Sequence, residues 1–101
     1  MTDETIIVGE KTFRCSVIPA GPVNIVIAAN KNGLVGCCSI DVQDLAGFGY
    51  AAAQVSAPKG RPSVATKDDL LRGFIKVANA PAKEKGVQVG MTGEEAPVLL
   101  G

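Results

Sequence analysis

Two adjacent cysteines, Cys37 and Cys38, are the side chains of this chain best suited to nucleophilic chemistry, and Asp41 follows closely after them. A thiolate at Cys37 could attack an electrophile while the Asp41 carboxylate orients water or substrate. The chain contains no histidine, however, so the usual base that activates a thiol is absent. The competing interpretation is packing, because free cysteine is among the residue types most often buried. We therefore assign no catalytic residue and keep Cys37 and Asp41 as candidates.

The two adjacent thiols do not form an obvious pair. They lie in an apolar segment, residues 34–40, that is typical of a strand. Successive side chains of a strand point to opposite faces of the sheet, so one thiol is expected in the core and the other on the opposite surface. The third cysteine, Cys15, alternates with polar residues in a half-buried strand pattern, and we interpret it as a packing residue.

A second group of candidate ligand-binding residues, Gly90, Thr92 and Glu95, lies near the C-terminus. Glycine lets a ligand approach the backbone closely, although it also simply permits turns. Thr92 precedes Glu95 by three positions, which is the spacing of a capping box at a helix start. We expect a cleft for a small molecule or partner between this turn and the end of the Cys37–Asp41 segment.

The same capping-box spacing occurs twice more, at Asp41 with Asp44 and at Thr66 with Asp69. Such pairs satisfy the free N–H groups of a helix start, so stability explains them without any function.

A basic loop at residues 59–61 could hold an anion, because glycine exposes backbone N–H groups between two cations. It lacks the P-loop and dinucleotide spacings, and we favour a solvated loop.

Charge and composition argue against several functional classes. Ten basic residues balance ten acidic ones, so we predict no nucleic-acid partner and no attraction to an anionic membrane. Three cysteines without histidine match no zinc-ligand spacing, and neither a metal site nor a cofactor is predicted. The odd cysteine count suits a reducing cytoplasm. The polar, acidic N-terminus and the lack of an apolar run of about 18 residues predict a protein that is neither secreted nor membrane-spanning.

The sequence pattern predicts one domain, residues 1–101, of mixed α+β class, whose strands and helices must position these residues. Residues 1–40 are strand-rich, with apolar runs separated by turn residues, which predicts an antiparallel meander with strands at 5–8, 12–18, 23–29 and 34–40 and turns at 19–22 and 30–33. Residues 41–101 form a helix and strand region, with helices predicted at 42–56, 66–71, 81–85 and from 92, and strands at 63–65 and 74–78. The alternative for 42–56 is a helix that ends near Phe48 followed by a strand at 51–55, and Pro97 is expected to limit the last helix.

Self-association follows from the strand pattern. The runs at 23–29 and 34–40 are apolar on both faces and need cover on both sides, yet only short helices remain to supply it. Burying several hundred Å² is favoured by about 25 cal/mol per Å², so we expect residues 1–40 to pack against another copy in a homo-oligomer. The alternative is a monomer with one well-covered sheet.

Three stretches, residues 33–42, 66–71 and 86–96, together resemble the YunC-like domains of unknown function, which are small bacterial and archaeal proteins. The most specific part is Gly-Met-Thr-Gly-Glu-Glu-Ala at 90–96. The resemblance implies an α/β domain whose strand-rich N-terminal part assembles tetramers, with no established activity. Cys37 and Asp41 match the family's Cys-Gly-x-x-Asp stretch, whereas Cys38 replaces its glycine. Pro97 and the loop at 58–62 also depart from the family pattern.

The function predicted from these observations is binding of a small molecule or partner by a cytoplasmic homo-oligomer, with no reaction or ligand named. One alternative is a cysteine-dependent enzyme or redox protein, in which a lysine or arginine of a neighbouring subunit replaces the missing histidine beside Cys37. The other alternative is a purely structural accessory domain.

Overall fold

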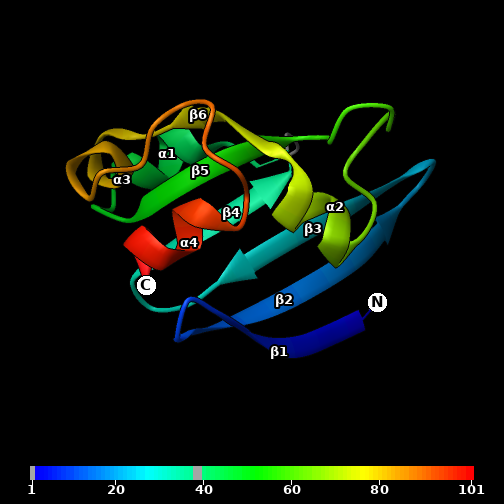
Figure 1. Cartoon of the computed structure of the whole chain (residues 1–101), viewed down its shortest axis with the longest axis horizontal. Helices are drawn as coiled ribbons and strands as arrows, with labels where there is room; N and C mark the ends of the chain where they lie inside the picture. Colours follow the sequence, from blue (N-terminus) through cyan, green and yellow to red (C-terminus); the bar gives the residue numbers. More distant parts are fainter. Residues whose placement is uncertain (1, 38–39) are drawn as a thin grey trace.

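Six strands form one mixed sheet whose spatial order, β1-β2-β3-β4-β5-β6, follows the sequence. The computed structural model describes residues 2–37 and 40–101 (Figure 1). The strands are β1 (Thr2–Val8), β2 (Lys11–Ala20), β3 (Val23–Ala29), β4 (Gly33–Cys37), β5 (Ala51–Ser56) and β6 (Phe74–Ala78). The helices are α1 (Val42–Ala46), α2 (Lys67–Arg72), α3 (Ala80–Glu84) and α4 (Glu95–Leu100). The predicted mixed α+β class, with strands mostly in the N-terminal half, is confirmed.

The predicted antiparallel meander is confirmed for β1 to β4, each of which pairs with its neighbour along the chain. The β2–β3 turn is shorter than predicted, because Pro19 still pairs with Asn24 and Gly21 makes the reversal with φ of 61°. The β3–β4 turn is closed by Asn30, whose Oδ1 accepts the Gly33 N–H at 3.0 Å. Within the described residues β4 ends at Cys37, and Cys38 lies outside them.

The parallel pair in this sheet is β4 with β5, which are connected through α1. The prediction of one helix over 42–56 is therefore wrong, and its alternative, a short helix followed by a strand at 51–55, is confirmed. Helix α1 ends at Ala46, and Gly49 lies in the turn that follows with φ of 71°, a left-handed conformation. The alanines that follow are buried on both faces between β4 and β6, so sheet burial overrides their helical spacing.

Two further predictions need correction. Residues 63–65 form no strand, because they belong to an irregular segment beside α2. The last helix is not limited by Pro97, since Pro97 is its third residue and the N–H groups of a first turn have no helical partner to lose. The helices predicted at 66–71 and 81–85 are confirmed within two residues, and the strand at 74–78 has the predicted bounds.

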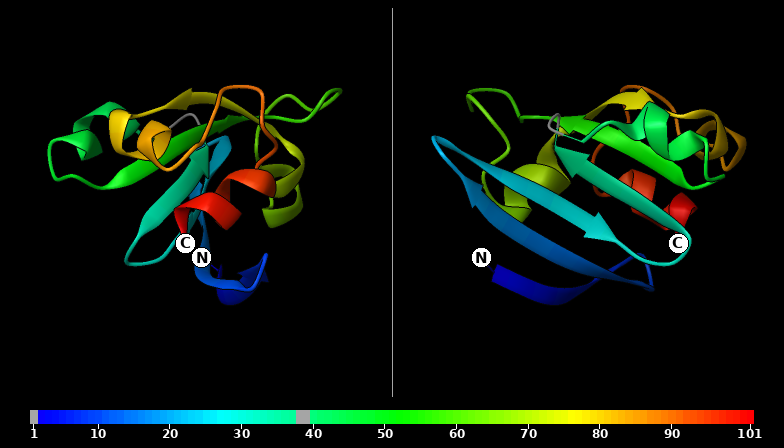
Figure 2. Two further views of the ribbon diagram at one scale, coloured as in Figure 1. Left: turned by 60° about the vertical axis from the view of Figure 1, so that its left-hand side comes forward. Right: turned by 180° about the vertical axis from the view of Figure 1, so that it is seen from behind.

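Helices cover both faces of the C-terminal half of the sheet. The main core lies on the face under α2 and α4, where its largest buried side chains include Phe13, Leu70 and Leu100. A smaller cluster around Val42 lies on the opposite face, where α1 packs on β5. Figure 2 shows the two helix layers and, in the rear view, an outer face of β1–β3 that no helix of the described chain covers. None of these helices combines the length and apolar character needed to cross a membrane.

Candidate functional site

A pocket of about 270 Å³ lies where the parallel strands β4 and β5 end. Cys37 is the last residue of β4 and Ser56 the last of β5, and both line the pocket. Its other walls come from Asn24 on β3 and from Ser63 and Val64. In open α/β sheets ligands bind outside the carboxyl ends of the strands, so the pocket lies where the fold predicts a site.

One wall of the pocket is formed by residues 57–66, which we call the strap, and the strap is held in place by Asp69 at the start of α2. The Asp69 carboxylate accepts the Ala65 N–H at 3.1 Å and pairs with the Arg61 guanidinium at 3.2 Å. From the sheet side, the Asn24 amide donates to the Ala65 carbonyl at 2.8 Å. The strap is therefore anchored on two sides, and Arg61 of the predicted basic loop is engaged in an ion pair.

The Asp69 carboxyl is buried, and burial by itself works to raise its pKa. The Ala65 N–H, the Arg61 charge and the Thr66 hydroxyl outweigh this effect, so the pKa of Asp69 lies below its ordinary value. Thr66 also caps α2 by accepting the Asp69 N–H at 3.1 Å, as its spacing predicts. The strap anchor is therefore ionised at neutral pH.

Cys37 is a free thiol that is only 4% exposed and belongs to the main core. Cys37 nevertheless lines the pocket, and none of the described residues that line this pocket carries a charge. Cys15 is also free and buried, but it does not line the pocket, and burial raises the pKa of its thiol. Cys38, the other predicted candidate thiol, falls outside the described residues.

Asp41 does not line the Cys37 pocket. Its carboxylate caps α1 by accepting the Gln43 N–H at 3.1 Å and the Asp44 N–H at 3.2 Å. Helix α1 packs on the face opposite the main core, to which Cys37 belongs. The described geometry thus gives Asp41 a structural role, as its capping spacing predicts, and separates it from the thiol.

The second predicted group lies along the outer edge of β6, two strands away from Cys37. Gly90 donates its N–H to the Ile75 carbonyl at 2.9 Å, which helps to cover this edge. The Thr92 hydroxyl donates to the Glu95 carboxylate and accepts the Glu95 N–H, both at 3.1 Å. The structure therefore brings Thr92 and Glu95 together in a hydrogen-bonded turn before α4, whose N-cap is Glu94, and the lining of the Cys37 pocket includes neither of them.

Of the described residues that line the pocket, only Cys37 is a predicted site residue, and the prediction missed Asn24, Ser63 and Val64 among the others. Asn24 sits in an apolar strand pattern without a motif, and Ser63 with Val64 follows a proline-bounded loop. Only the packing of the strap against β3 brings them together. Among the described residues, no group of three or more His, Cys, Asp or Glu side chains is placed to hold a metal ion.

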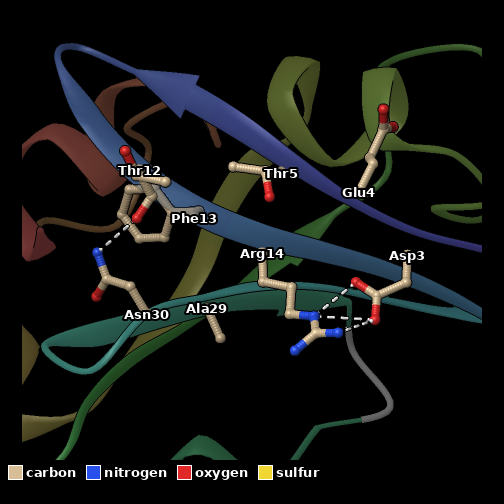
Figure 3. Close-up of a pocket in the computed structure, with 8 residues that line it drawn as sticks. All are labelled: Asp3, Glu4, Thr5, Thr12, Phe13, Arg14, Ala29 and Asn30. Carbon is tan, nitrogen blue, oxygen red and sulfur yellow. Dashed lines mark hydrogen bonds and ion pairs between the residues drawn. The ribbon is translucent and has the colours of Figure 1, made fainter.

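A larger hollow of about 490 Å³ lies on the outer face of β1 and β2, and Figure 3 shows its residues. The polar groups there engage one another. Arg14 Nε donates to the two Asp3 carboxylate oxygens at 2.8 and 2.9 Å, and the Asn30 amide donates to the Thr12 carbonyl at 3.1 Å. Because these groups are already paired and lie on an uncovered strand face, this hollow is a weaker ligand site than the Cys37 pocket.

A family described as a domain of unknown function (DUF1805) matches residues 36–100. The chain belongs to this family. The DUF1805 region contains Cys37, the strap and all four helices, whereas Asn24 precedes it. The pocket is therefore built from the DUF1805 region and one wall of the preceding hairpin.

Among solved structures, this DUF1805 protein is similar to a protein of unknown function, TA1206, from Thermoplasma acidophilum. The TM-score is 0.84 at 20% sequence identity, with 99% of this chain and 92% of the other covered. At this identity the similarity shows a shared fold. No curated protein matches the chain.

Proposed function

We propose that this protein is a binding domain whose ligand site is the Cys37 pocket. The observation that supports the proposal best is the position of the pocket, where the parallel strands β4 and β5 end and a strap closes one wall. Its lining is mainly apolar with a few polar groups, which is the usual composition of small-molecule sites.

Cys37 supplies a built-in reporter for this proposal. We expect iodoacetamide to modify Cys37 in the native protein, because Cys37 lines the pocket. The Val64→Phe variant should slow this modification about tenfold or more, since Val64 lines the same pocket and a larger side chain would occupy it. Site-resolved mass spectrometry separates the three cysteines, and Cys15 serves as the buried control.

The rate at which iodoacetamide modifies Cys37 in the native protein is compared with the rate in the unfolded chain. Equal labelling of Cys37 in the native wild type and the Val64→Phe variant would show that the reagent does not enter through the pocket. Modification of Cys37 only on unfolding would show that the pocket gives a small molecule no access to the Cys37 thiol. Either result contradicts the proposed binding site.

A homo-oligomer, which the YunC-like resemblance specifies as a tetramer, is a second element of the proposal. It is supported by the outer face of β1–β3, where Ile7 is 73% exposed and Ile18 and Ile27 are half-buried. Single exposed apolar residues are common, but several on one uncovered sheet face indicate an interaction surface. We propose that this face packs against another copy.

We also propose a narrower family assignment and a cellular location. The Gly-Met-Thr-Gly-Glu-Glu-Ala stretch at 90–96 lies inside the matched DUF1805 region and supports a YunC-like member. The free thiols of Cys15 and Cys37 support a reducing compartment such as the cytoplasm.

A cysteine-dependent enzyme is the second candidate function, favoured by the one observation that Cys37 borders a pocket. The described lining residues provide no charge to assist the thiol, so this function requires a cation from another subunit. A Cys37→Ser variant separates the two functions, because it would abolish thiol chemistry while retaining a pocket of nearly the same shape.

A further inference from the structure

We infer that the Cys37 pocket takes a small uncharged molecule with an apolar body and a hydrogen-bond donor. This inference rests on the proposed function and specifies the class of ligand. It depends on three properties of the lining: its charge, its free hydrogen-bonding groups and its volume.

The charge of the lining favours a neutral ligand. All the described residues around the pocket are apolar or uncharged polar ones. The nearby ions that hold the strap, Arg61 and Asp69, pair with each other at 3.2 Å and do not line the pocket. A charged ligand would lose water without gaining a counter-ion, which is costly in a partly apolar site.

The free polar groups favour a ligand that donates a hydrogen bond. The Asn24 amide nitrogen must face the Ala65 carbonyl, to which it donates at 2.8 Å, so the Asn24 Oδ1 is left as the acceptor. Within the described chain, nothing donates to this oxygen, and the Ser63 hydroxyl forms no hydrogen bond. Ser56 is engaged, since its hydroxyl donates to the Phe74 carbonyl at 3.2 Å.

The volume limits the ligand to about one substituted ring. The pocket measures about 270 Å³. This exceeds the roughly 150 Å³ of an apolar cavity that holds benzene, and it falls below the roughly 300 Å³ at which drug-sized sites begin. A single ring with one polar substituent could place the ring against Val23 and Val64 and its donor at Asn24.

Three probes of similar shape test the inference: benzamide, benzoate and benzylammonium. Titration into isotope-labelled full-length protein, followed by amide NMR spectra, should show benzamide shifting the signals of Ser56, Ser63 and Val64. We expect benzamide to bind these residues about tenfold more tightly than either charged probe. Benzoate or benzylammonium binding there as tightly would overturn the neutral-ligand inference while leaving the proposed site intact. A lack of response at these residues to all three probes would overturn both.

A matched pair of variants at Ser63 adds an independent check. Ser63→Asp introduces a carboxylate at the pocket wall, whereas Ser63→Asn introduces a neutral side chain of the same size. We expect Ser63→Asp to bind benzylammonium about tenfold more tightly than wild type does, and Ser63→Asn to leave that affinity within about twofold. Unchanged benzylammonium binding in Ser63→Asp, with the folded spectrum retained, would show that Ser63 does not contact the probe and would overturn the inference.

Discussion

The side-chain amide of Asn79 donates a 2.8 Å hydrogen bond to the backbone carbonyl of Val42, which lies 37 residues earlier in the chain. The same amide donates to the Tyr50 carbonyl at 2.9 Å, and its oxygen accepts the N–H groups of Ala52 and Ala82 at 3.1 and 3.0 Å. Asn79 is fully buried, and both ends of its amide are engaged. One side chain therefore joins α1, β5 and α3, and so fixes the crossover between β4 and β5, at whose carboxyl ends the pocket lies.

Replacement of Asn79 should destabilise the whole domain. Asn79→Ala leaves two buried carbonyls and two buried N–H groups without this partner, and each unsatisfied group costs about 1–3 kcal/mol. We expect the free energy of unfolding, measured by urea denaturation, to fall by about 3 kcal/mol or more. The control is Asn32→Ala, which removes one exposed hydrogen bond to the Gly101 carbonyl and should cost less than about 1 kcal/mol. Similar losses in both variants would contradict the role assigned to Asn79.

Acid should weaken the strap anchor at Asp69. Because the folded-state pKa of Asp69 is lowered, its contribution to stability is complete above the unfolded-state pKa of about 3.9 and is lost as the pH falls through the folded-state pKa. The free energy of unfolding should therefore fall less between pH 6 and pH 3 in Asp69→Asn than in wild type.

The control for acid denaturation is Asp68→Asn, which removes the same charge from an exposed neighbour that forms no ion pair within the described chain. Its pH dependence should follow that of wild type. If Asp68→Asn and Asp69→Asn reduced the loss of unfolding free energy between pH 6 and pH 3 equally, general charge repulsion would explain the pH dependence. The strap anchor would then not be its cause.

Gly93 is required by packing, and substitution should show this. A Cβ atom at Gly93 would overlap the Leu70 carbonyl oxygen, which is backbone and cannot move independently of α2. We expect Gly93→Ala to lower the thermal midpoint by about 8–16 °C, which corresponds to a destabilisation of about 2 kcal/mol.

Gly47→Ala is the matched control for Gly93→Ala. Gly47 has an ordinary helical φ of −62°, and the nearest atom to an added Cβ is the Asp44 carbonyl oxygen at 3.4 Å. Alanine restricts the unfolded chain, so this variant should be neutral or more stable by about 0.5 kcal/mol. A midpoint for Gly93→Ala equal to that of Gly47→Ala would show that the segment after β6 relaxes freely.

The proposed oligomer should depend on the outer face of β1–β3. Ile7→Lys places a charge in the proposed interface and should reduce the molar mass measured by light scattering after size-exclusion chromatography. Val89→Lys removes a comparably exposed apolar side chain from the segment between α3 and α4 and should leave the mass unchanged. A wild-type protein that elutes as a monomer at every concentration would reject the oligomer.

Local patterns in the sequence predicted most of the elements. The alternation around Cys15 and the turn residues near Asn30 are short-range signals, and the strands there form as expected. Asp41 and Thr66 cap helices at the predicted positions, because a cap needs only the two or three residues that follow it. The failure at 42–56 has a long-range cause, since the small alanines of β5 suit a helix until β4 and β6 enclose them.

The candidate site depended on contacts that no local pattern encodes. Cys37 and Asp41 are four residues apart in sequence, yet the crossover assigns them to different faces of the sheet. Asn24 and Ala65 are 41 residues apart and share a hydrogen bond at the pocket wall. Strand alternation and helix caps are short-range effects, so the sequence by itself determined the meander and most helix starts. The position, lining and neutral charge of the pocket were decided only by tertiary structure, because they arise where the strap closes over the ends of the parallel strands.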